Sequence, residues 1–174
     1  MPAYARNNSG PPAMDGKPLW TPSPERVAGA NLTHFMRAAG ARWGRTFIDY
    51  TSLHRWSIEQ REEFWVSIWE FCEVEGVRGD KVLLNGERMP GATWFPEARL
   101  NFAQNLLRTQ DESTALVFWG ENKLKRRMSH AELYRRVAQL AAAMRADGIQ
   151  AGDRVAAYLP NVPEAIIAML AATA

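Results

Sequence analysis

The side chains that could carry chemistry in this chain are few. The three histidines, His34, His54 and His130, do not stand at metal-ligand spacing from Cys72 or from a pair of carboxylates, so the sequence offers no metal site. We expect the histidines to be structural or surface residues, with His130 in the first turn of a helix. Cys72 falls among aromatic residues, and we expect a small buried hydrophobe rather than a nucleophile.

Glycine-rich phosphate loops are absent from the sequence. No two of the 12 glycines are adjacent, and none are spaced Gly-x-Gly. The chain therefore contains neither a dinucleotide-binding fingerprint nor a Walker loop.

Four basic residues gather at one place, namely Lys123, Lys125, Arg126 and Arg127. Such a run could bind phosphate. The alternative is the charged edge of a hairpin, which discourages pairing with another strand. We favour the hairpin edge, because Glu121 and a net charge of only +2 weaken the field.

Two further features could have a function. Trp65 and Trp69 could form a stacking platform, but their helical spacing favours packing in a core. The turn at residues 160–164 follows the carboxyl end of an expected strand, where open α/β sheets place their ligands. A turn between a strand and a helix also needs no ligand, so both interpretations of it stay open.

The composition limits the class of protein. At 174 residues, 47% hydrophobic and 23% charged, the chain can form a globular core. The small net charge gives no reason to expect a nucleic acid or an anionic membrane as partner. No apolar stretch approaches the ~20 residues of a membrane span. One cysteine excludes an internal disulfide, and no signal-peptide core is present, so we expect a cytoplasmic protein.

The aromatic residues divide the chain. Every Trp and Phe lies between Trp20 and Trp119, and the sequence after this range is rich in alanine. We expect a disordered tail over residues 1–18 and an accessory region, packed by aromatic side chains, over 19–108. The start of a different core is expected over 109–174.

In the accessory region we expect three helices. The first is predicted from Ser23 as N-cap, with Pro24 in its first turn, to Gly44. The second is predicted from a capping box of Ser57 and Gln60 to about residue 76. Pro96 is expected near the start of a third helix that carries three apolar residues on one side, namely Leu100, Ala103 and Leu107.

The last third of the sequence predicts the start of an α/β domain. Segments 114–119 and 124–128 are expected to pair across a turn at 120–122. A helix capped by Ser129 and Glu132 should follow and close at Gly148.

A buried strand over residues 152–160 and an apolar helix from Pro163 are expected to follow. One strand and one helix cannot bury each other in water, since a parallel sheet needs a neighbouring strand. We therefore expect the chain to be the front part of a larger α/β protein.

Several segments of the sequence resemble those of acetoacetyl-CoA synthetases. Residues 94–107 read WFPEARLNFAQNLL and are similar to the family's WFPGARLNYAENLL. Glu97 stands in place of its Gly and Gln104 in place of its Glu. Residues 18–23 and 64–69 also resemble this family. Segments 128–133 and 152–165 resemble motifs shared by the wider superfamily of acyl-adenylate-forming enzymes.

The resemblance implies the reaction of a ligase. ATP with Mg²⁺ would activate acetoacetate as an acyl-adenylate and release pyrophosphate, and the thiol of CoA would displace AMP to give acetoacetyl-CoA. The family's phosphate loop, adenine motif, ribose-binding Asp, catalytic Lys and main CoA contacts would all lie beyond Ala174. We therefore assign no catalytic, cofactor-binding or metal residue in this chain.

Three functional hypotheses follow. The first is the N-terminal part of an acetoacetate–CoA ligase, inactive alone, unable to hold ATP, Mg²⁺ or CoA tightly, and partnered by the remainder of the adenylating domain. The second is a stand-alone binding or interaction module. The third is a non-functional truncated product.

Overall fold

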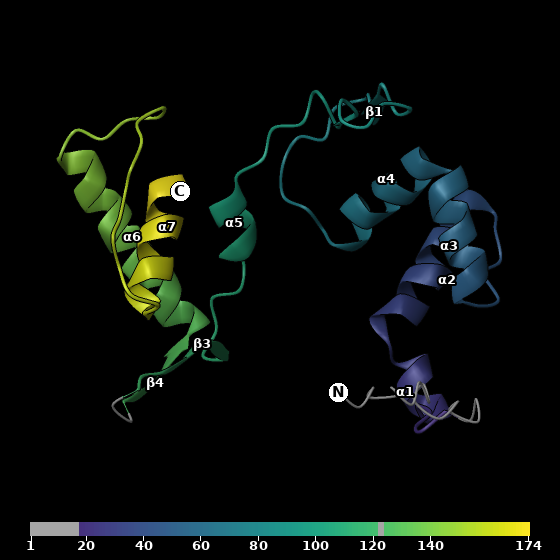
Figure 1. Ribbon diagram of the computed structural model, residues 1–174, viewed down its shortest axis with the longest axis horizontal. Helices are drawn as coiled ribbons and strands as arrows, with labels where there is room; N and C mark the ends of the chain where they lie inside the picture. Colours follow the sequence, from purple (N-terminus) through teal and green to yellow (C-terminus); the bar gives the residue numbers. More distant parts are fainter. Residues whose placement is uncertain (1–17, 122–123) are drawn as a thin grey trace, which may run out of the picture. The chain divides into compact units, whose positions relative to one another are not determined.

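A computed structural model describes residues 18–121 and 124–174. Within these ranges the chain forms two compact units, one ending at Ile58 and the other beginning at Glu59 (Figure 1). Helices and two small antiparallel sheets make up the elements, as expected for a mixed α/β chain. None of the described helices is long and apolar enough to cross a membrane. The tail predicted over residues 1–18 lies almost entirely outside the described residues.

The first predicted helix is two helices, α1 (Pro24–Ala28) and α2 (Asn31–Trp43). The predicted ends are correct, because the hydroxyl of Ser23 accepts a hydrogen bond from the Arg26 amide and Gly44 is left-handed. The prediction of one continuous helix is wrong. Gly29 is the C-cap of α1, and glycine costs about 1 kcal/mol in a helix interior, which favours a break there.

A third helix, α3 (Tyr50–Glu59), is absent from the sequence prediction. Its start is a reciprocal cap: the Ser52 amide donates to Asp49 Oδ1 at 2.7 Å, and the Asp49 amide donates to Ser52 Oγ at 3.2 Å. Ser57, predicted to begin a helix, lies inside α3 instead, where its hydroxyl donates to the His54 carbonyl at 2.7 Å. Residues 57–60 therefore have the sequence of a capping box, but Ser57 does not cap a helix.

In the core of the first unit, the backbone that follows α2 passes very close to Gly40 of this helix. A Cβ on Gly40 would lie 2.6 Å from the Arg45 carbonyl oxygen, so only glycine lets the chain after α2 return against this helix. That return places the Phe47 ring 5.0 Å from the Trp56 ring of α3. Phe35 and Leu53 are also buried.

In the second unit, aromatic rings join α4 (Arg61–Phe71) to the strand β2 (Thr93–Trp94), which pairs with β1 (Leu83–Leu84). Trp65 contacts Trp94 with ring centroids 5.5 Å apart, and Trp69 contacts Phe95 at 5.2 Å. These contacts support packing as the role of the two helical tryptophans, although Trp65 stays partly exposed.

The helix α4 ends earlier than predicted. Cys72 is its C-cap, and Glu73 turns the chain with a φ of 52°. The expectation that Cys72 is buried is wrong, because the residue stands at this outward turn and is exposed.

The helix predicted near Pro96 starts six residues later, as α5 (Phe102–Leu106). Asn101 is its N-cap and accepts a hydrogen bond from the Gln104 amide at 2.9 Å. Residues before Asn101 are held instead by backbone pairing between Val77 and Arg99. Of the three apolar residues expected on one side, Ala103 and Leu107 are buried and Leu100 is exposed.

The hairpin and helix predicted next are present as β3 (Thr114–Trp119), β4 (Lys125–Ser129) and α6 (His130–Ala146). The Ser129 hydroxyl caps α6 by accepting from the Glu132 amide at 3.1 Å. Asn122, predicted in the hairpin turn, lies outside the described residues. The last helix, α7 (Pro163–Thr173), begins at the predicted proline.

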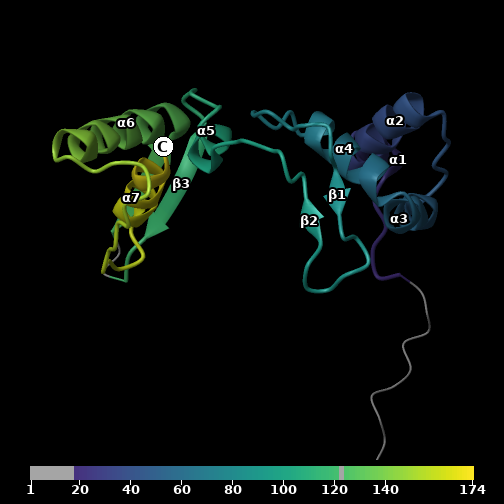
Figure 2. The same cartoon turned by 90° about the horizontal axis from the view of Figure 1, so that it is seen from above.

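One apolar core joins these elements. The helices α6 and α7 lie side by side, as both views show (Figures 1 and 2). Nine residues form the buried cluster, and they belong to α5 and its C-cap, β4, α6 and α7: Ala103, Leu107, Met128, Leu133, Val137, Ala141, Ile167, Leu170 and Ala171.

The strand predicted over residues 152–160 is not formed. This segment is an extended coil between α6 and α7 (Figure 1), and its residues are exposed, with Tyr158 fully so and Leu159 half exposed. The segment has the sequence pattern of a buried strand, but the described residues contain no strand that pairs with it. A parallel strand forms only with a hydrogen-bonding neighbour.

Candidate functional site

The turn singled out in the sequence lines a groove of about 340 Å³. One wall is the strand β3 through residues 116–119, and the other is Asn161, Val162, Pro163 and Ile166 at the start of α7. The Val162 amide donates to the Pro160 carbonyl at 2.9 Å, which closes the turn within itself. The structure therefore brings the hairpin and this turn together.

An ion pair joins the rim of this groove to the basic run. Arg126 Nη1 of β4 lies 2.8 Å from Glu164 Oε1, in the first turn of α7. The hydrogen bond from Arg126 holds the pKa of the Glu164 carboxyl below its usual range. Arg126 is thus engaged with a carboxylate of the same chain rather than held ready for a phosphate.

The rest of the basic run also fits a hairpin edge. Lys125 Nζ lies 4.3 Å from the centre of the Trp119 ring, a cation–π contact across the hairpin. Arg127 is exposed and pairs with Val117 in the strand register. Lys123 lies outside the described residues.

A serine, an aspartate and a histidine meet at the start of α6, which the sequence alone did not indicate. The Ser113 hydroxyl donates directly to Asp111 Oδ1, and the His130 amide donates to the Ser113 carbonyl at 3.0 Å. The Ser113 hydroxyl holds the pKa of Asp111 below its usual range, and the nearby His130 adds to this. A catalytic triad needs the histidine between serine and carboxylate, so this cluster shapes a turn and activates no nucleophile.

Polar residues within and on either side of α5 tie three segments together. Asn105 bonds both backbone groups of Glu75, with its Oδ1 and Nδ2 each 2.9 Å away. Asn101 Nδ2 donates to the Thr173 carbonyl at the end of α7, at 2.6 Å. Arg108 donates to the Cys72 and Glu73 carbonyls at the end of α4. We call Asn101, Asn105 and Arg108 the clasp.

The two departures from the resembled motif both make hydrogen bonds. Glu97 Oε2 accepts from the amides of Asp80 at 3.0 Å and Lys81 at 3.4 Å. The Asp80 amide is the main cause that holds the pKa of Glu97 below its usual range. Gln104 Nε2 donates to Glu75 Oε2 at 3.0 Å. Both side chains fasten the 75–81 loop.

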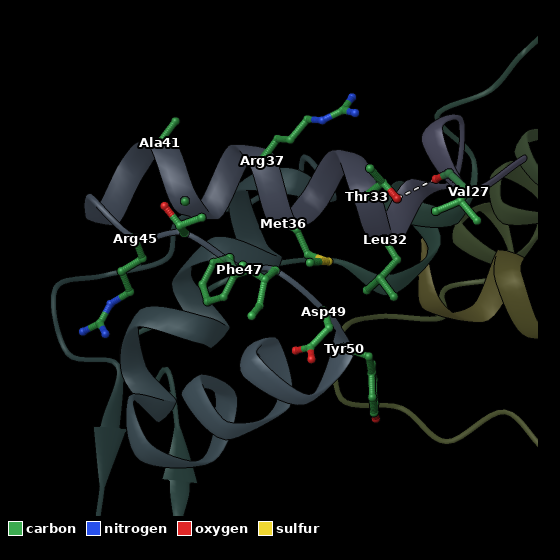
Figure 3. Close-up of a pocket in the computed structure, with 13 residues that line it drawn as sticks. Val27, Leu32, Thr33, Met36, Arg37, Ala41, Arg45, Phe47, Asp49 and Tyr50 are labelled. Atoms are coloured by element: carbon green, nitrogen blue, oxygen red, sulfur yellow. Dashed lines mark hydrogen bonds between the residues drawn. The ribbon is translucent and has the colours of Figure 1, made fainter. Parts of the chain in front are cut away.

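The first unit has its own groove of about 480 Å³, between α2 and residues 45–50 (Figure 3). Met36 and Leu32 point from α2 toward that segment, whereas Arg37 points away from it. The lining is mainly apolar and holds no nucleophile paired with a base, so this groove suits packing or an apolar group rather than catalysis.

Neither groove holds a metal-binding set. Among residues 18–121 and 124–174 no three His, Cys, Asp or Glu side chains stand close enough to bind a metal ion together. We therefore assign no metal-binding residue among these residues and derive no catalytic step through a metal from them.

Comparison with known families gives two matches along the chain. Residues 50–106 match the acetyl-coenzyme A synthetase N-terminus, and residues 102–174 match the AMP-binding enzyme family. Over residues 50–174 the chain is therefore similar to AMP-binding enzymes of the acid–CoA ligase type. Members of this class use ATP, Mg²⁺ and CoA.

Within this class the chain is homologous to acetoacetyl-CoA synthetases. It is 49% identical to that of Rhizobium meliloti over 155 residues, which is 89% of this chain and 24% of the relative. It is 34% identical to that of Danio rerio over 91% of this chain and 24% of the relative. The malonamoyl-CoA synthetase vrtB of Penicillium aethiopicum is 36% identical over 79% of this chain and 20% of the relative.

A solved structure agrees with these matches. The acetoacetyl-CoA synthetase from Streptomyces lividans superposes with a TM-score of 0.80 at 40% identity, over 90% of this chain and 25% of that one. The chain thus spans about a quarter of the length of the relatives it matches.

Proposed function

We propose that this chain supplies the N-terminal part of an acetoacetate–CoA ligase. The whole enzyme would convert ATP, acetoacetate and CoA to acetoacetyl-CoA, AMP and pyrophosphate through an acyl-adenylate. The observation that carries the proposal is the 49% identity to the Rhizobium meliloti enzyme across nearly the whole chain. The domain boundary near residue 108 belongs to the same proposal.

In this proposal the chain is scaffold rather than catalyst. Its polar side chains bind groups of the same chain. Arg126 pairs with Glu164, Asn105 hydrogen-bonds to Glu75, and Arg108 hydrogen-bonds to the end of α4. These contacts fix the hairpin, the loop after α4 and α7 relative to the second unit's core. Transfer of the adenylyl group and of the acyl group would be carried out by residues outside the 174 of this chain.

The experiment is a replacement of the matching quarter of the Rhizobium meliloti enzyme by this chain. Acetoacetyl-CoA formation is measured for the chimera, for the intact relative and for the relative lacking that quarter. We expect the chimera to be active and the shortened relative to be inactive. An inactive chimera that folds as well as the intact relative would contradict the proposal.

The acyl substrate is tested with the whole enzyme that this proposal assigns to the chain. Acetoacetate and malonamate are close in size, and one relative is named for each acyl group. We expect acetoacetate to be preferred, because the relatives with 49% and 34% identity carry that name. A higher kcat/KM for malonamate would move the proposal to that acid.

A stand-alone binding module is the second candidate, and the groove of about 480 Å³ is the observation in its favour. Isothermal titration of the isolated chain with CoA separates the two. Saturable 1:1 binding would support the module, and the absence of binding is what the scaffold role predicts.

A further inference from the structure

We infer that residues 79–81 form a binding site for a small oxyanion, and that the carboxylate of Glu97 occupies this site in the intact chain. The ligand class is a carboxylate or a phosphate group, held by backbone amides and one ammonium group. The inference goes beyond the proposed function, because it concerns a loop that needs no part of the ligase outside this chain. It can therefore stand or fail whatever the activity of the whole enzyme.

The donors of this site converge on one side chain. The amides of Asp80 and Lys81 both donate to Glu97 Oε2, at 3.0 and 3.4 Å, and Lys81 Nζ lies 3.7 Å from Glu97 Oε1. Gly79, directly before them, has a left-handed φ of 77°, and a Cβ on it would lie 2.5 Å from the Glu97 Cβ. Successive amides that point the same way beside a left-handed residue form a nest, which is a concave binding place for anions. Two amides and one ammonium group thus surround a carboxylate.

The backbone around the nest is held by contacts that do not involve the Glu97 side chain. Before the loop, Val77 and Arg99 exchange two backbone hydrogen bonds, of 2.9 and 2.8 Å. After the loop, the Phe95 amide donates to the Val82 carbonyl at 2.7 Å. We therefore expect the nest to keep its shape when the Glu97 carboxylate is removed.

Access to the nest depends on the Glu97 side chain. The exposed fraction of this side chain is 45%, and that of Lys81 is 63%, so the nest opens to solvent. A carboxylate tethered to the same chain acts at an effective concentration of about millimolar or higher, so a weakly bound free anion does not displace it. The motif WFPGARL, which residues 94–100 resemble, has glycine at the position of Glu97. A chain with that glycine has no carboxylate for the nest, so this position decides whether a free anion can enter.

Glu97→Ala is the test, with inorganic phosphate and acetate as separate probes at constant ionic strength. The amide signals of Asp80 and Lys81 are followed by NMR, and their hydrogen exchange is measured beside that of α6. We expect each probe to shift both signals saturably and to slow their exchange roughly two- to tenfold, the equivalent of one hydrogen bond. Phosphate should bind more tightly than acetate, since it carries more charge and more acceptor oxygens.

Two further variants control the measurement. Glu112→Ala removes an equal charge from another loop and should leave the Asp80 and Lys81 signals without a saturable shift, as in the original chain. Lys81→Met added to Glu97→Ala removes the ammonium group and should weaken the binding of phosphate more than that of acetate.

Each other outcome overturns the inference. An absence of saturable shifts in Glu97→Ala, with the Val77 and Arg99 amides still protected from exchange, would mean that the loop binds no free anion. Loss of protection at Val77 and Arg99 that neither probe restores would mean that the carboxylate holds the loop in shape and fills no preformed nest. Saturable binding to the original chain or to Glu112→Ala would mean that Glu97 does not occupy the site.

Discussion

The side-chain amide of Asn105 binds both the N–H and the C=O of Glu75, each at 2.9 Å. Asn105 lies in the short range, 102–106, where the two matched families overlap, and Glu75 lies thirty residues before it. The Asn105 amide therefore pairs with the backbone of the loop after α4, as a neighbouring strand would. It holds that loop against the start of the AMP-binding region.

The clasp gives the first prediction. Asn105→Ala removes both bonds to Glu75 and is expected to lower the free energy of unfolding by about 1–3 kcal/mol. Urea unfolding followed by circular dichroism measures the change. Gln110→Ala removes an exposed amide in the following loop and should stay within about 0.5 kcal/mol of the original protein. Equal losses in the two variants would contradict a special role for Asn105.

The Arg126–Glu164 pair gives a prediction on pH. Because the pKa of Glu164 is lowered in the folded chain, the pair stabilises above the unfolded-state pKa and this contribution is lost as pH falls through the folded value. Arg126→Met should raise the pKa of Glu164 toward its usual value, as measured by NMR titration of the carboxyl.

Arg127→Met is the matched control for this titration, since it removes an equal charge one residue away on β4. It should leave the pKa of Glu164 nearly unchanged. A rise as large as that in Arg126→Met would show that general charge, not the direct hydrogen bond, is the cause.

Two of the three serines predicted to cap helices, Ser129 and Ser57, give a third prediction. Ser129→Ala removes the real cap of α6 and should cost about 1 kcal/mol of stability. Ser57→Ala falls inside α3, where alanine is the better helix former, and should be neutral or slightly stabilising. Thermal unfolding of the two variants measures the difference, and a larger loss at Ser57 would contradict the assignment of the caps.

Glu97 gives a fourth prediction, on local mobility. Glu97→Ala removes the acceptor for the Asp80 and Lys81 amides, so these amides should exchange faster with solvent. Glu112→Ala, an exposed carboxylate on another loop, should leave them unchanged. Unchanged exchange in Glu97→Ala would mean that the loop is held by other contacts.

The sequence predicted the elements whose determinants are local. Ser129, Pro163 and the hairpin on either side of Gly120 lie where expected, because caps, first-turn prolines and hairpin pairing act over a few residues. Helix α3 escaped prediction because its cap pairs Asp49 with a serine in the third helical position, where a capping box carries Glu or Gln.

The clasp and the strand at 152–160 depend on distant residues. Nothing in the sequence around Asn105 indicates a special role, because its partner Glu75 lies thirty residues earlier in the chain. The strand prediction is correct about sequence preference and wrong about the described structure, because a parallel strand depends on a neighbour that these residues do not provide. Local pattern predicts elements, whereas pairing over long distances requires the structure.

The most direct measurement is the AMP formed by the isolated 174-residue chain when ATP, Mg²⁺, acetoacetate and CoA are supplied, with the Rhizobium meliloti chimera assayed beside it. The account predicts acetoacetate-dependent AMP from the chimera and none from the isolated chain, because the chain's polar groups hold its own fold. AMP that forms with the isolated chain in proportion to acetoacetate would contradict it.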